Sequence, residues 1–83
     1  MAEHVLKYRS LLRALRRHGI HEEKKRGKGS HRMLVGVVDG TLIKHPIKCH
    51  NEGEKKPKAV IASVRRAFKL TPEYGVSDDD FYR

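Results

Sequence analysis

The stretch "HRMLVGVVDGTLIKH", residues 31 to 45, decides the fold. Two runs rich in β-branched residues flank an Asp-Gly pair, and this pattern favours a type I′ turn at Asp39-Gly40. The sequence therefore predicts a hairpin of two strands, at about residues 30–38 and 41–45. Alternation groups His31 with Met33 and places Arg32 on the other side of the strand, unless a β-bulge at Gly36 switches the two sides.

Helical patterns lie on both sides of this hairpin. In residues 4–18 the apolar positions recur as one stripe of a helix, and Gly19 supplies its C-terminal stop. A second helix is expected from Pro57 to Leu70, with an outer stripe that includes Arg65. Residues 20–23 predict a short edge strand, whereas residues 24–29 and 46–56 predict loops.

These elements predict an α+β fold in the order α-β-β-β-α. A three-stranded antiparallel sheet carries both helices on one face, and its other face stays free. We expect one domain over residues 1–83, with its core at about 5–70 and a short acidic tail at 71–83. Within the tail, Thr71-Pro72-Glu73 and Ser77-x-x-Asp80 are typical of helix starts.

The charge of the chain favours a polyanionic partner. The 83 residues include 19 Lys and Arg against 10 Asp and Glu, a net charge of +9. Residues 1–70 hold 18 of these basic residues and 6 of the acidic ones, so the body and not the tail is expected to face the anion. A domain of this size has no room for a spacious internal cavity, so we expect an open binding face.

Cysteine content and hydropathy predict the compartment. The single Cys49 excludes an internal disulfide, and no stretch has the apolar length of a secretory signal or a membrane span. A reducing cytoplasm is therefore expected, without membrane association. A basic helix can lie on an anionic membrane, but this chain has no Trp for the apolar side of such a helix.

Three segments together resemble the HicA family of bacterial toxins, over about residues 5 to 70. They are "LLRALRRHGI", "GKGSHRML" and "HPIKCHNEGEKKPKAVIASVRRAF". The resemblance implies a fold like that of the double-stranded-RNA-binding domain, ribonuclease activity against messenger RNA, and neutralisation by a HicB-type antitoxin. It also implies that His31 is the catalytic histidine. The chain departs from the family's usual Gly-Thr-Leu-Arg at the second helix start, where it has Pro57-Lys58-Ala59-Val60.

RNA cleavage without a metal needs two proton carriers and a positive charge beside the phosphate. A histidine suits either proton role, because its ordinary pKa of about 6.5 lies near neutral pH. Since the resemblance supplies one histidine, the second proton carrier is left open, with His50 as a candidate. The expected site comprises His31 as the catalytic residue and, as RNA-binding residues, Arg26, Lys28, Gly29, Ser30 and Arg32. No cofactor or metal is expected.

Three other interpretations stay open. The same basic face suits a non-catalytic RNA-binding module, which would have no need of the His31 imidazole. A DNA-binding regulator is less well supported, because no helix-turn-helix pattern is present. A zinc site at His45, Cys49 and His50 has too few ligands in the usual paired spacings.

Overall fold

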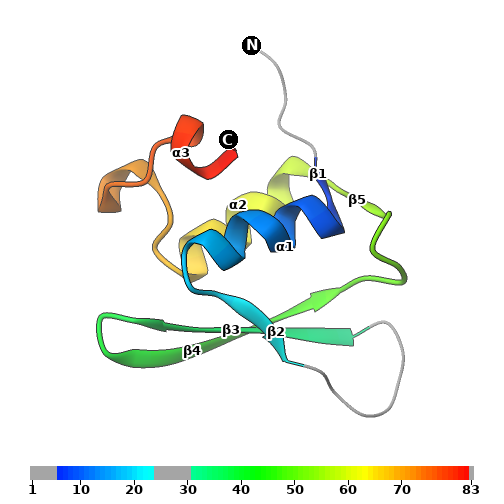
Figure 1. Cartoon of the computed structure of the whole chain (residues 1–83), viewed down its shortest axis with the longest axis horizontal. Helices are drawn as coiled ribbons and strands as arrows, with labels where there is room; N and C mark the ends of the chain where they lie inside the picture. Colours follow the sequence, from blue (N-terminus) through cyan, green and yellow to red (C-terminus); the bar gives the residue numbers. More distant parts are fainter. Residues whose placement is uncertain (1–5, 24–30, 83) are drawn as a thin grey trace.

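A three-stranded antiparallel sheet forms one layer of the computed structural model, which describes residues 6–23 and 31–82 (Figure 1). Its order is β2 (His21–Glu23), β3 (His31–Val38) and β4 (Thr41–Lys48). Both turn residues have positive φ, 52° at Asp39 and 79° at Gly40, which confirms the predicted type I′ turn. The expected α+β architecture is confirmed at this level.

Two corrections concern the hairpin. The β4 strand runs to Lys48, three residues beyond its expected end and through Pro46, because an edge strand tolerates a residue that cannot donate a ladder hydrogen bond. Gly36 makes no bulge, since the register between β3 and β4 is continuous. Its missing side chain instead leaves room for Ile20, whose Cγ1 would lie 2.6 Å from a Cβ at position 36.

Helices α1 (Tyr8–Arg17) and α2 (Lys58–Ala67) cover one face of the sheet (Figure 1). Gly19, with φ of 85°, follows α1 and confirms the predicted stop. The apolar sides of the helices meet the sheet in one core, which contains Leu11, Leu15, Leu34, Ile47, Ile61 and Val64. None of the helices in residues 6–23 and 31–82 has the length and apolar character to cross a membrane.

A second, two-stranded sheet was not expected from the sequence. Strand β1 (Leu6–Lys7) pairs with β5 (Lys55–Lys56) in antiparallel register. Residues 6 and 7 therefore do not belong to the first helix, and the segment 46–56 is not all loop. The pairing holds the N-terminus of α1 next to the N-terminus of α2.

The C-terminal segment folds back onto the helices. It forms a 3₁₀ turn, η1 (Pro72–Tyr74), and a third helix, α3 (Asp78–Tyr82), whose Phe81 is completely buried in the main core. Both expected helix starts are present, and the Asp80 amide donates to Ser77 Oγ at 3.1 Å. Arg65 does not lie on an outer stripe as expected: it is buried, donates to the Leu70 carbonyl at 2.7 Å and pairs with Asp78 at 2.8 Å.

The face of the sheet opposite α1 and α2 has no other described element packed on it (Figure 1). We call it the free face. Because cross-strand partners share a face, the register assigns its members. They are His21 and Glu23 on β2, His31, Met33, Val35 and Val37 on β3, and Leu42, Lys44, Pro46 and Lys48 on β4.

Candidate active site

His31 is the first residue of β3 and lies exposed on the free face. The neighbouring residues of β3 show on which face His31 lies. Leu34 is completely buried in the core beneath the helices, and side chains alternate along a strand. Residues at odd positions of β3 therefore point away from the helices. An extended RNA strand can reach the His31 imidazole there without entering a cavity.

Lys48 is the register partner of His31 on β4. Its side chain is exposed on the same face. Opposed residues in an antiparallel pair have Cβ atoms about 4.5–5.5 Å apart. The described sheet thus brings one imidazole and one ammonium together at its open end, far from the Asp39-Gly40 turn.

Arg32 does not join this pair. It lies on the helix side of β3, where its guanidinium is 3.6 Å from a Glu22 carboxylate oxygen and 3.9 Å from one of Glu52. The same group lies 5.4 Å from the ring centroid of Tyr8. The expectation that Arg32 flanks His31 beside a bound phosphate is therefore not supported by the geometry, because alternation along the strand separates their side chains.

The Tyr8 hydroxyl completes the cluster around Arg32. It donates to Glu22 Oε1 at 3.3 Å. Burial, with the Glu22 charge second, raises the pKa of Tyr8 well above its ordinary value. This network of Tyr8, Glu22 and Arg32 holds α1 against β2 and β3.

Arg26, Lys28, Gly29 and Ser30, four of the expected RNA-binding residues, lie outside the described residues. Their roles stay predictions.

His50, the candidate second proton carrier, is exposed and follows Lys48 by two residues. Its backbone amide donates to Glu54 Oε1 at 2.7 Å, and this hydrogen bond is the main cause of the lowered pKa of Glu54. The bond fixes the backbone of the 49–54 loop at the His31 end of β4. His50 therefore belongs to the same end of the sheet as His31.

The residues considered for zinc point in different directions. His45 lies on the helix side of β4, where its ring meets Phe68 edge-on at 6.4 Å, and burial lowers its pKa. Cys49 is buried, its thiol is 3.0 Å from the Asn51 carbonyl oxygen, and burial raises its pKa. In residues 6–23 and 31–82, no group of three or more His, Cys, Asp or Glu residues is arranged to hold a metal ion.

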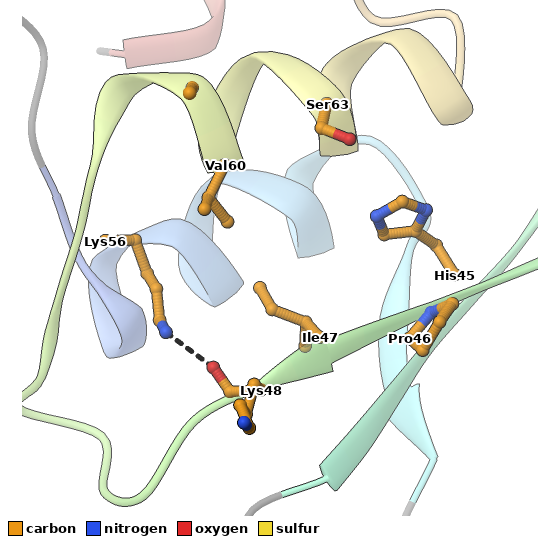
Figure 2. Close-up of a pocket in the computed structure, with 8 residues that line it drawn as sticks. His45, Pro46, Ile47, Lys48, Lys56, Val60 and Ser63 are labelled. Carbon is orange, nitrogen blue, oxygen red and sulfur yellow. Dashed lines mark hydrogen bonds between the residues drawn. The ribbon is translucent and has the colours of Figure 1, made fainter.

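A groove of about 360 Å³ runs between β4 and the first half of α2 (Figure 2). Ile47 and Val60 form its floor, and His45 and Ser63 lie at one end. At the other end the buried Lys56 ammonium donates to the Lys48 carbonyl. His31 does not line this groove, so the candidate active site is on the free face.

Lys48 was missed because the sequence interpretation ended the strand at residue 45. A usable signal was present, since in a hairpin with a two-residue turn the opposed positions can be counted outward from Asp39-Gly40. That count reaches the pair His31 and Lys48 if β4 is allowed to continue through Pro46.

Comparisons with known proteins do not identify a family. No family model matches the chain, and neither the curated proteins nor the solved structures searched contain a match to it. The resemblance to the HicA toxins thus rests on the sequence segments alone.

Proposed function

We propose that the protein is an endoribonuclease that cleaves messenger RNA without a metal and acts as the toxin of a HicA/HicB-type pair. One observation carries the proposal: His31 lies exposed on the only sheet face that the described helices leave free. A histidine that merely stabilised the fold would gain nothing from this position. The motif resemblance at Gly29-Ser30-His31 points to the same residue.

The proposed reaction is a transesterification within the RNA. A base removes the proton from a 2′-hydroxyl, the O2′–P bond forms, and the P–O5′ bond breaks as an acid protonates the leaving 5′-oxygen. His31 carries one of these protons and His50 is the candidate for the other. The products are a 2′,3′-cyclic phosphate and a free 5′-hydroxyl.

RNA binding is proposed to use the basic segment that leads into β3. Arg26 and Lys28 would contact phosphates, and Gly29 and Ser30 would bring the backbone close to the strand. The proposed overall shape is that of a double-stranded-RNA-binding domain, which meets RNA mainly through backbone and 2′-hydroxyl contacts. Such binding without cleavage is the alternative function.

The biological role follows from the proposed activity. A ribonuclease active in its own cytoplasm must be held inactive until it is needed. The proposed inhibitor is a HicB-type antitoxin that covers the free face.

The test compares three proteins on one RNA in the presence of EDTA: wild type, His31→Ala and His21→Ala. His21 is a matched control, because it is an exposed histidine on the same face but belongs to β2. We expect His31→Ala to lower the cleavage rate at least about 10²-fold while still binding RNA, since one proton carrier contributes about 10²–10⁴-fold. His21→Ala should cleave normally.

Three results would contradict the proposal. Cleavage by folded His31→Ala at the wild-type rate would remove His31 from the reaction. A wild-type protein that binds RNA and leaves it intact would favour the non-catalytic RNA-binding module. Loss of cleavage on addition of EDTA would contradict the metal-independent mechanism.

A further inference from the structure

Lys48 and His31 lie on the free face at the same end of the sheet. The two residues are opposed across β3 and β4. The Lys48 carbonyl is turned to the outer edge of β4, where Lys56 binds it. This orientation fits a pair without mutual backbone hydrogen bonds, in which the Cα atoms approach to about 4.5 Å and side chains lie closest.

The charges of the neighbouring cations are already engaged. Arg32 is paired on the helix side, as described above. Lys44 shares the free face with Lys48, but its ammonium lies 3.8 Å from a Glu23 carboxylate. Among the described residues, no carboxylate lies within ion-pair distance of the exposed Lys48 ammonium, so its charge is available to an anion.

The backbone at Lys48 is held in place from the opposite side. Lys56 is only 6% exposed, and its ammonium binds both the Lys48 carbonyl and, at 3.0 Å, a Glu54 carboxylate. In Figure 2 the Lys48 side chain points away from this contact and from α2, toward the free face. A partly buried ion pair thus fixes the end of β4 while the Lys48 side chain stays exposed.

We infer that Lys48 is a second catalytic residue of the proposed ribonuclease, with its ammonium on the non-bridging oxygens of the phosphate that His31 acts on. The inference rests on the proposed function. In the transesterification, negative charge builds up on these oxygens while the O2′–P bond forms and the P–O5′ bond breaks. A cation fixed beside them stabilises that charge and takes up no proton.

The experiment measures binding and chemistry separately for Lys48→Gln, Lys48→Arg and Lys44→Gln. Single-turnover cleavage at saturating protein reports the chemical step, and the Kd for the same RNA with a 2′-deoxy nucleotide at the cleaved position reports binding. Lys44→Gln is the matched control, because it removes the same charge from the same strand and face. Thermal unfolding checks that all variants are folded.

We expect Lys48→Gln to lower the saturated cleavage rate about 10²-fold, the usual effect of losing one electrostatic stabiliser. Binding of the deoxy RNA should weaken only a few-fold. Lys48→Arg should recover most of the rate because it restores the positive charge, and Lys44→Gln should cleave within about twofold of wild type.

Two outcomes would overturn the inference and leave the proposed function standing. In one, Lys48→Gln cleaves at the wild-type rate while His31→Ala does not cleave. In the other, Lys48→Gln weakens binding but reaches the wild-type rate at saturation, which would make Lys48 a binding residue only. If the wild-type protein itself does not cleave RNA, the proposed function fails first, and the inference with it.

Discussion

At the scale of single residues, His45 links stability to pH. Burial on the helix side of β4 lowers its pKa, so the folded protein favours the neutral imidazole. In the unfolded chain the ordinary pKa is about 6.5, and the unfolded state therefore binds more protons just below that pH. The His45 contribution to stability is fully present above about pH 6.5 and is lost as the pH falls through 6.5 toward the lowered pKa.

We therefore predict that His45→Leu flattens the fall in stability between pH 7.5 and pH 5.5. Urea unfolding at several pH values measures it, with His21→Gln as a control that removes an exposed imidazole. An unchanged pH dependence in His45→Leu would show that another group causes the acid sensitivity.

Single residues also show where sequence patterns reach their limit. The turn at Asp39-Gly40 was predictable from the sequence. A type I′ turn requires positive φ at two adjacent positions, and Asp-Gly is one of the few residue pairs that favour this conformation. The place of Arg32 among Glu22, Glu52 and Tyr8 was not predictable, since these partners come from three other segments. The need for glycine at position 36 was not predictable either. It comes from the close approach of Ile20, which is a tertiary contact and leaves no local sequence pattern.

At the scale of elements, the long periodic segments were predictable and the short ones were not. Helices α1 and α2 and the β3–β4 hairpin follow from local periodicity. The two-residue strands β1 and β5 are too short to show alternation and exist only because they meet each other. The candidate site was predictable at His31 through its motif, but Lys48 depended on the true length of β4.

The C-terminal helix α3 gives the element-scale prediction. Its three acidic residues made the segment resemble a solvated tail, yet Phe81 is completely buried and Arg65 lies 4.6 Å from its ring. Phe81→Ala should lower the free energy of unfolding by about 3–5 kcal/mol, the usual cost of emptying a large buried aromatic site. Chemical denaturation measures the change.

Tyr74→Ala is the matched control, because Tyr74 is an aromatic residue of the same segment that is 57% exposed. We expect a change of no more than about 1 kcal/mol there, mostly from the lost contact with Lys69. If Phe81→Ala is as mild as Tyr74→Ala, α3 does not contribute to the core.

At the scale of the whole molecule, one face of the sheet packs against the helices and the opposite face is free. Helices α1 and α2 bury one face of a three-stranded sheet (Figure 1). The pairing of β1 with β5 joins the segments that lead into those helices, and Phe81 of α3 packs in the same core. The free face keeps His31 and Lys48 exposed at one end and Val37 and Leu42 exposed at the other. None of the elements described in residues 6–23 and 31–82 crosses this face.

We predict that the inhibitor and RNA exclude each other on the free face. The inhibitor should be acidic where it meets Lys48 and the basic segment before His31, because complementary charge speeds the encounter and disfavours wrong partners. Adding excess partner to a complex of His31→Ala with labelled RNA should release the RNA. Lys48→Glu should slow association with the partner, whereas the same reversal at Arg66, exposed on α2, should not. A stable ternary complex that still holds the RNA would show that inhibition acts from a distance, since a partner seated over His31 leaves no path for a phosphate to reach it.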